Sequence, residues 1–372
     1  MGKWACARNS AGSVSRSGWL AGGDARATVA PMPLRIVQWT TGLVGRSAVK
    51  AVLEHPELEL VGCYSWSPDK VGKDVGELCG LGKIGVTATD DFDAILALRP
   101  DCVLYMPLQW VVDDMVRLLE AGVNVVSTAN FITGKSYGEK DMLRLDEAAR
   151  RGGASLYGTG INPGLANVLG LVATAVCRRV DRVSVLESVD ATAYASAQTW
   201  LDIGFASPPD SPGLYEKARQ RMLVFLDAVE MMASALEVAL DEVRFDVEFG
   251  TATRDLDLGY MQIGRGTICG LKGVWSGRVN GKSIIELGLC WRLGDAMTPD
   301  WPTEEGYVIE VDGVPNVRAR YAIQYPANVT DFGIATANPA VNAIRAVVAA
   351  APGLVTADQL PVISASGFVA TA

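Results

Sequence analysis

Residues 34–46 read LRIVQWTTGLVGR, a short apolar run that ends in a glycine-containing turn. A helical pattern begins near Val44, with apolar side chains recurring on one face. This succession of strand, glycine turn and helix is typical of the start of a dinucleotide-binding fold, because the helix N-terminus offers unpaired N–H groups to a pyrophosphate. Thr40 replaces the usual first glycine, so Gly42 is expected to form the tight turn and Gly45 to let the backbone approach the pyrophosphate. The predicted pyrophosphate site comprises Thr41, Gly42, Leu43, Val44 and Gly45.

The length and charge of the chain limit its class. A chain of 372 residues is longer than a single core usually supports, so two domains are expected. The apolar content of 49% is ordinary for an α/β enzyme, and the longest apolar runs are too short to cross a bilayer. A net charge of −9 without any basic run argues against nucleic acid or an anionic membrane surface as partners.

Cysteine and histidine usage narrows the chemistry further. Seven cysteines are scattered without a Cys-x-x-Cys pair, so buried, reduced thiols in a cytoplasmic protein are expected. The single histidine, His55, argues against a histidine-based metal site, and no metal is predicted. Residues 1–31 are rich in Ser, Ala, Gly and Arg and lack apolar periodicity. A transit peptide can have this composition, but a disordered extension before a natural start at Met32 is the simpler expectation.

Residues 32–178 are predicted to form a Rossmann-type, doubly wound parallel sheet. Apolar strands alternate with amphipathic helices in this region, which is typical of right-handed βαβ units. The predicted strands are 34–39, 58–64, 101–106, 123–128 and 154–157. The predicted helices are 44–54, 92–98, 110–121 and 139–151, and Asp90-Asp91 is a plausible N-cap for the second of them.

Residues 179–330 are predicted to form a second, α+β domain for substrate binding and dimerisation. Period-two segments indicate an antiparallel sheet, with strands at 182–190, 243–249, 266–279, 283–292, 307–311 and 317–324. Hairpin turns are expected at Asn280-Gly281 and at Asp312-Gly313, and one long helix is expected over 214–239. Residues 331–372 are predicted to carry a helix, 339–350, that returns to the first domain.

The carboxyl ends of the first-domain strands are expected to surround the cofactor, since ligands of doubly wound sheets bind there. Ser65 and Ser67 follow the second strand, where NAD-preferring folds usually place a carboxylate, and Lys70 is close in sequence. NADP is therefore favoured over NAD as the cofactor, with Ser65 near the adenosine ribose. The residues expected around the nicotinamide are Met106, Pro107, Ala129, Asn130 and Asn162.

Proton transfer has four candidates outside the cofactor loops: Lys135, Tyr137, Glu187 and Asp190. A carboxylate buried between domains can have its pKa raised enough to act as an acid. Glu187 and Asp190 fall on opposite faces of a strand, so one of them is expected to face the crevice. The sequence does not choose among the four.

Several segments carry a resemblance to known enzymes. The stretch Val61-Gly-Cys-Tyr-Ser65 together with Gly72-Lys-Asp-Val-Gly-Glu-Leu-Cys-Gly80 resembles the N-terminal domain of dihydrodipicolinate reductases. The loop GTGINPG (158–164), the strand LESVD (186–190) and the segments WRLGD (291–295) and PDWP (299–302) resemble a branch of that superfamily. That branch contains 2,4-diaminopentanoate dehydrogenases and native amine dehydrogenases. The resemblance implies a homodimer that reversibly reduces, with NAD(P)H, an imine made from a carbonyl compound and ammonia.

Two departures from these relatives are visible in the sequence. The His-His-x-x-x-Lys active-site segment of dihydrodipicolinate reductases has no counterpart here. The Thr-Cys-Glu-Glu segment of amine dehydrogenases, whose glutamate handles the amine proton, corresponds to Thr128-Ala129-Asn130-Phe131. Asn130 is therefore kept as a catalytic candidate at a position without a carboxylate. The alternatives are a nucleotide-binding sensor without turnover and a carbonyl reductase.

Overall fold

The computed structural model describes residues 32–370, so the predicted extension 1–31 lies outside the described residues. The first domain is built on a seven-stranded sheet in the order β16-β6-β5-β4-β1-β2-β3, with every neighbouring pair parallel. Its strands are β1 (Leu34–Trp39), β2 (Leu58–Tyr64), β3 (Ala88–Thr89), β4 (Cys102–Tyr105), β5 (Asn124–Ser127), β6 (Ser155–Gly158) and β16 (Gly353–Val355).

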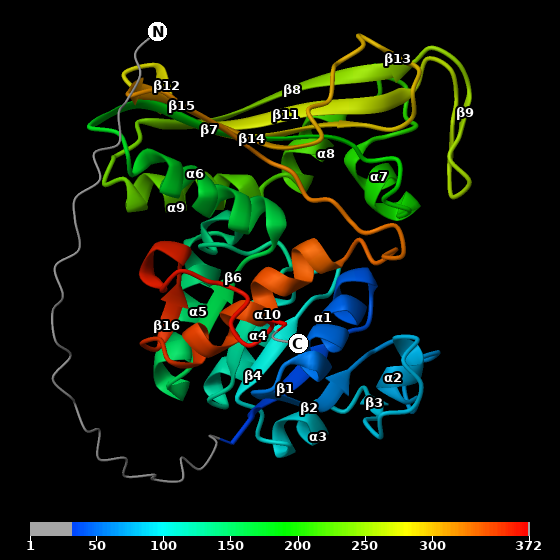
Figure 1. Ribbon diagram of the computed structural model, residues 1–372, viewed down its shortest axis with the longest axis vertical. Coiled ribbons are helices and arrows are strands. Elements are labelled where there is room, and N and C mark those ends of the chain that lie inside the picture. Colours follow the sequence, from blue (N-terminus) through cyan, green and yellow to red (C-terminus); the bar gives the residue numbers. More distant parts are fainter. Residues whose placement is uncertain (1–31, 371–372) are drawn as a thin grey trace, which may run out of the picture. The chain divides into compact units, whose positions relative to one another are not determined.

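Helices cover both faces of this sheet (Figure 1). One apolar core joins α1 (Leu43–Glu54) and α10 (Ile334–Val348) to inward residues such as Ile36 and Leu104. Their strand neighbours Val37 and Val103 point to the other face, where they pack with the remaining helices. These are α3 (Phe92–Ala97), α4 (Val112–Glu120) and α5 (Glu139–Gly152), while the short α2 (Val75–Leu78) lies beside β3. The predicted doubly wound architecture is confirmed.

The second domain contains another seven-stranded sheet, in the order β13-β8-β11-β12-β7-β14-β15. Its strands are β7 (Arg179–Asp190), β8 (Glu242–Ala252), β11 (Ile268–Val279), β12 (Lys282–Arg292), β13 (Met297–Thr298), β14 (Gly306–Val314) and β15 (Val317–Tyr321). A two-stranded ribbon is formed by β9 (Leu256–Asp257) and β10 (Gln262–Ile263). The sheet is mixed, because β12 and β7 pair in parallel while the other pairs are antiparallel.

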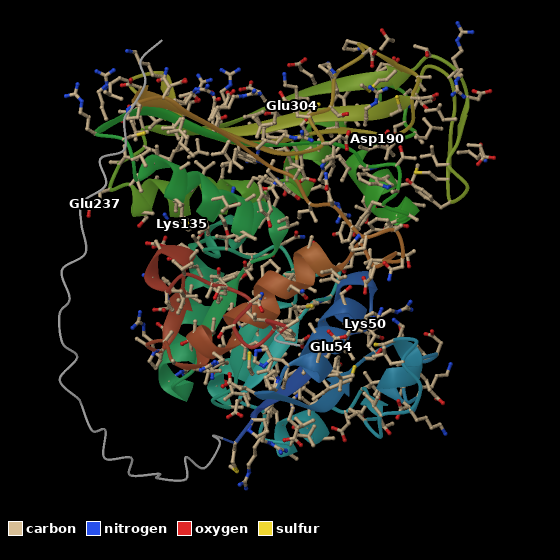
Figure 2. The ribbon with its side chains drawn as sticks, viewed as in Figure 1. Lys50, Glu54, Lys135, Asp190, Glu237 and Glu304 are labelled. Atoms are coloured by element: carbon tan, nitrogen blue, oxygen red, sulfur yellow. The ribbon has the colours of Figure 1, made fainter. Side chains whose placement is uncertain are left out.

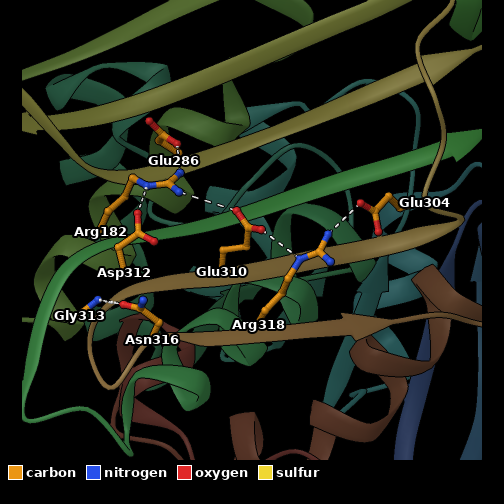
Figure 3. A network of polar contacts seen from close by, with 8 residues as sticks. All are labelled: Arg182, Glu286, Glu304, Glu310, Asp312, Gly313, Asn316 and Arg318. Atoms are coloured by element: carbon orange, nitrogen blue, oxygen red, sulfur yellow. Dashed lines mark hydrogen bonds and ion pairs between the residues drawn. The ribbon is translucent and has the colours of Figure 1, made fainter.

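Helices lie on one face of the second sheet (Figure 1): α6 (Ala166–Thr174), α7 (Ala197–Ile203), α8 (Leu214–Arg221) and α9 (Val224–Ala235). The opposite face carries an ion-pair network, drawn in Figure 3. Arg182 contacts Glu286 at 2.5 Å, Asp312 at 2.8 Å and Glu310 at 3.7 Å. Arg318 contacts the same Glu310 at 3.1 Å and so extends the network across β14.

Most predicted elements are confirmed, and three details are corrected. The expected helix over 214–239 is two helices, α8 and α9, separated near Met222. Met222 packs on β11 at Gly273, where a Cβ would lie 2.5 Å from its sulfur. The expected turn at Asp312-Gly313 is wrong, since both residues belong to β14, at a register irregularity. Gly313 is needed there because a Cβ would lie 2.1 Å from the Arg179 carbonyl oxygen. The edge elements β3, α2 and β16 were not predicted.

Other local predictions hold. Asn280 and Gly281 connect β11 to β12 with φ values of 51° and 74°, as a type I′ turn requires. Asp91 caps α3, its carboxylate accepting from the Ala94 N–H at 3.0 Å. The C-terminal helix α10 begins at Ile334, five residues before the predicted start, and packs on α1 in the first domain. Within the described residues no helix is both long and apolar enough to span a bilayer.

Candidate active site

The predicted pyrophosphate loop lies between β1 and α1, at the point where the sheet order reverses between β1 and β4. Thr40, not Gly42, makes the unusual turn: its φ is 72°, a left-handed conformation that costs a β-branched residue roughly 1–2 kcal/mol. The Thr40 hydroxyl donates to the Met106 carbonyl oxygen at 3.2 Å, which ties the ends of β1 and β4 together. This hydrogen bond anchors the turn beside the point where the sheet order reverses.

The two glycines have different surroundings. Gly42 has an ordinary φ of −72°, and a Cβ there would find no atom within 4 Å, so its backbone faces open space. At Gly45 a Cβ would lie 2.3 Å from the Thr40 carbonyl oxygen. Gly45 is thus required for α1 to pack on the preceding turn, and Gly42 leaves the N–H groups of Leu43 and Val44 accessible to an anion.

Cationic and hydroxyl groups gather beside this loop. Arg46 Nε and Lys70 Nζ each donate to the Thr41 carbonyl oxygen at 3.3 Å, and neither forms an ion pair within residues 32–370. Ser65 is only 2% exposed, directly after β2, whereas the neighbouring Trp66 is 54% exposed. The Thr41 hydroxyl is buried and has no hydrogen-bond partner among the described atoms. An open backbone cradle with two cations and an unsatisfied hydroxyl fits the phosphates of a dinucleotide.

The predicted nicotinamide residues lie at the same edge of the sheet. Met106 and Pro107 are buried after β4, and Ala129 and Asn130 follow β5. Asn162 lies in the turn η2 (Ile161–Leu165) after β6. A cavity of about 100 Å³ brings Asn130 and Asn162 together, with Thr128, Thr159 and Thr336 on its walls.

Asn162 also belongs to a larger cavity of about 550 Å³, formed mainly by the second domain. Its side-chain Nδ2 donates to Glu187 Oε2 at 2.9 Å, while its Oδ1 is buried without a hydrogen-bond partner in the described part of the chain. Aromatic side chains form much of the wall: Tyr194, Trp200, Trp291, Tyr307, Tyr325 and Phe332. This second cavity is therefore mostly apolar, with one amide shared with the first.

Glu187 is the distinctive polar group of the larger cavity. Trp291 Nε1 donates to its Oε1 at 2.9 Å, so two neutral donors hold the carboxylate. No ion pair to Glu187 occurs within residues 32–370. Burial raises the pKa of Glu187 above the ordinary glutamate value, although the hydrogen bonds from Asn162 and Trp291 act in the opposite direction. A carboxyl group with a raised pKa and access to a cavity can act as a general acid or base.

The other proton-transfer candidates are engaged elsewhere. The expectation that only one of Glu187 and Asp190 faces the crevice is wrong: Asp190, the last residue of β7, also lines the larger cavity. Its carboxylate, however, accepts from the Thr192 N–H at 3.0 Å in a local turn. Lys135 pairs with Glu230 and lines neither cavity; Figure 2 shows it well apart from Asp190. Tyr137 donates its hydroxyl proton to the Asn130 carbonyl oxygen at 2.7 Å and so supports the loop that carries Asn130. Among the four, Glu187 alone combines cavity access with a raised pKa and a contact to Asn162.

Asp227 of α9 is a site-supporting residue that the sequence did not reveal. Its carboxylate accepts from the backbone N–H groups of Thr133 (3.1 Å), Gly134 (2.9 Å) and Ser136 (2.7 Å). The helix thereby holds the loop between β5 and η1 (Lys135–Tyr137), which carries Asn130. Asp227 lies in an apolar helix pattern, and only its burial and its distant backbone partners indicate this role.

Comparisons with known proteins agree with the geometry. Residues 36–151 match the family described as dihydrodipicolinate reductase, N-terminus, and residues 166–369 match the 2,4-diaminopentanoate dehydrogenase C-terminal domain. The chain is 31% identical to an amine dehydrogenase from Streptomyces virginiae over 89% of this chain and 97% of that protein. It is 25% identical to a 2,4-diaminopentanoate dehydrogenase from Acetoanaerobium sticklandii over 67% of this chain and 70% of that one.

A solved structure shows the same fold. The amine dehydrogenase from Mycobacterium smegmatis superposes with a TM-score of 0.73 at 21% identity, covering 90% of this chain and 98% of that one. The resemblance inferred from the sequence motifs is confirmed. The chain belongs to the family that joins a dihydrodipicolinate reductase-type N-terminal domain to a 2,4-diaminopentanoate dehydrogenase-type C-terminal domain, and it is an NAD(P)-dependent, amine dehydrogenase-like oxidoreductase.

Proposed function

We propose that this protein interconverts an apolar carbonyl compound and the corresponding primary amine, with Glu187 as the residue that takes up and releases the proton. The observation that carries the proposal is a carboxyl group without a cationic partner, held by Asn162 and Trp291 in a largely aromatic cavity. The overall reaction consumes a carbonyl compound, ammonia, a proton and the hydride of the reduced cofactor, and yields an amine and water. Bound NAD(P)H supplies that hydride.

The protonation state of Glu187 suits both directions. Its protonated form can donate to the oxygen that leaves as water when ammonia adds to the carbonyl carbon. Its charged form can accept a proton from a substrate ammonium group, which must become a neutral amine before it is oxidised. The unpartnered Oδ1 of Asn162 is available to accept from an N–H of the amine or of the nicotinamide amide. Asn162 would thus orient a ligand while holding Glu187.

The cofactor preference is part of this proposal. Ser65, Arg46 and Lys70 offer a hydroxyl and two cations near the end of β2, and a 2′-phosphate favours such groups over a carboxylate. NADPH is therefore expected to bind at least as tightly as NADH. Fluorescence titration with both nucleotides tests this, and a clear preference for NADH would contradict it.

We further propose a homodimer that works in the cytoplasm. The face of the second sheet that carries the Arg182 network has no helix packed on it within the described residues, and a second copy would cover it. The six cysteines in the described range are free, which suits a reducing compartment. Sedimentation velocity measures the assembly state, and a monomer at micromolar concentration would contradict the dimer.

The deciding experiment measures NADPH oxidation with a panel of ketones and aldehydes, with and without ammonia. Ammonia-dependent turnover that falls strongly in Glu187→Gln supports the proposal. Equal turnover without ammonia would favour a carbonyl reductase. The absence of a carboxylate at Asn130 favours one further candidate, a nucleotide-binding sensor, which would bind NADPH without turning over any ketone or amine.

A further inference from the structure

The connection from β15 to α10, residues 322–333, contacts both ligand sites, and we call it the strap. Five of its residues line the larger cavity: Ala322, Ile323, Gln324, Tyr325 and Phe332. Phe332 stands between Asp331 and Gly333 in the sequence. Gly333 lies against the first turn of α1. The strap therefore runs from the substrate cavity to the helix that begins the cofactor site.

Asp331 fastens the strap to α1. Its carboxylate accepts from the Ser47 hydroxyl and from Lys50 Nζ at 3.0 Å, and Figure 2 labels Lys50 on this helix. It also accepts from the Gly333 N–H at 3.2 Å, which shapes the end of the strap itself. Asp331 does not line the larger cavity. Its contacts are made entirely on the cofactor side.

Gly333 of the strap packs so closely on α1 that no larger side chain would fit there. A Cβ on Gly333 would lie 2.4 Å from Ser47 Oγ and 2.8 Å from the Leu43 carbonyl oxygen. Leu43 is the first residue of α1, next to the open backbone of Gly42. A displacement of the strap at this end would therefore change the packing around Leu43, which belongs to the predicted pyrophosphate site.

Phe332 occupies the adjacent position on the cavity side. It is 41% exposed, and its ring packs edge-on against Tyr325 with centroids 5.3 Å apart. Both rings line the cavity that contains Glu187. A large, partly exposed aromatic ring at a cavity wall limits the size of the ligand that the cavity accepts.

From these contacts we infer that Asp331 is a positioning residue that fixes Phe332 as a size-limiting wall of the substrate cavity. The inference rests on the proposed function for its substrate, a neutral ketone taken up with ammonia. Releasing Asp331 from Ser47 and Lys50 would let Phe332 move, and bulkier ketones would then be accepted. Truncating Phe332 itself would have the same effect directly.

The test compares Asp331→Ala, Phe332→Ala and the wild type on butanone and on benzylacetone, with ammonia and NADPH. The control variant is Glu57→Gln. Glu57 lies between α1 and β2 and forms an ion pair with Arg345 of α10 (2.5 Å), a contact that involves no strap residue. The ratio of kcat/KM for benzylacetone to that for butanone should rise about tenfold or more in Asp331→Ala and Phe332→Ala, and stay within about twofold in the control. An unchanged ratio in Asp331→Ala would overturn the inference.

Hydrogen exchange gives a readout that does not need turnover. Amides of residues 325–336 should exchange faster in Asp331→Ala than in the wild type and in Glu57→Gln. If no protein turns over any ketone, the proposed function fails, but unchanged exchange would separately show that Asp331 does not hold the strap.

Discussion

Replacing Glu187 by Gln removes the proposed proton carrier while preserving the shape of the cavity. A glutamine has one acceptor oxygen, which can still accept from Trp291 Nε1. Its amide would then face Asn162, whose side chain can turn so that Oδ1 accepts that N–H and Nδ2 takes its place on the ligand side. Both hydrogen bonds can therefore be kept, and the variant is expected to fold with a stability change within about 1 kcal/mol at low pH.

The expected loss of activity is much larger than the expected change in stability. A positioned acid or base contributes about 10²–10⁴-fold to a proton-transfer step. Glu187→Gln should therefore lower kcat/KM for ammonia-dependent reduction by that factor, or roughly 3–5 kcal/mol of transition-state stabilisation. The dissociation constant of NADPH should stay within about twofold, because Glu187 lies outside the pyrophosphate loop.

The pH dependence follows from the raised pKa of Glu187. In the wild type, amine oxidation should gain rate as pH rises through this pKa, above the ordinary glutamate value of 4.5, because the charged form accepts the proton. In Glu187→Gln this titration should disappear. Stability should show the matching linkage: the folded protein holds the proton more tightly than the unfolded chain, so the wild type loses stability as pH rises through the raised pKa. As pH rises from acidic to neutral, the melting temperature of the wild type should therefore fall relative to that of the variant.

The control is Glu305→Gln, which changes a second glutamate on the wall of the same cavity. Glu305 accepts from the Thr303 hydroxyl at 2.6 Å and from the Asp190 N–H at 3.4 Å, and it has no hydrogen bond to Asn162. Its variant should keep activity within about threefold. Equal activity in Glu187→Gln and the wild type, with ammonia-dependent turnover in both, would refute the assignment of Glu187.

Four further predictions concern the loops around the site. Asn130→Glu should leave ammonia-dependent reduction and NADPH affinity nearly unchanged, because Glu187 already carries the proton and a carboxylate at the exposed position 130 would be well solvated; a clear rise in rate would place the acid on this loop instead. Gly45→Val should abolish nucleotide binding in a fluorescence titration, because a Cβ would lie 2.3 Å from the Thr40 carbonyl oxygen. Arg46→Ala should weaken the binding of NADPH about 10-fold more than the binding of NADH, and an equal loss for both would place Arg46 at the pyrophosphate alone. Asp227→Asn should lower the free energy of unfolding by about 2–4 kcal/mol in chemical denaturation, since an amide cannot accept from every N–H that Asp227 now holds.

The first domain was predictable from the sequence because its signals are local. Each βα unit combines an apolar strand, a turn and an amphipathic helix within a short segment, and α3 even has its cap at Asp91. The topology of a doubly wound sheet then brings the strand ends together, so residues as distant as Met106 and Asn162 could be predicted to lie at the same edge of the sheet. The short edge strands β3 and β16 were not predicted, because a strand of two or three residues is too short to show an alternating apolar pattern.

The larger cavity was less predictable because it depends on long-range strand pairing. Glu187 was one of four candidates, and the sequence contained no sign that Trp291 would donate to it. That contact requires β12 to run parallel to β7, with Trp291 opposite Val189, and the alternating patterns alone suggested an antiparallel arrangement. Asp227 was hidden for a similar reason, since its partners lie about ninety positions earlier in the chain.

The position of Glu187 would also explain how the chain can work without a carboxylate at Asn130, in the loop where amine dehydrogenases carry their glutamate. Asn130 adopts a left-handed conformation (φ 48°) and is exposed, so a charged group there would be well solvated and its pKa little raised. Glu187 instead projects from a central strand, flanked by β12 and β14, where its direction is fixed and burial raises its pKa. Asn162, from the turn after β6, reaches this carboxylate directly. Under the proposed function, moving the acid from the cofactor loop to the sheet domain keeps it beside the nicotinamide site while giving it the low-polarity surroundings that raise its pKa.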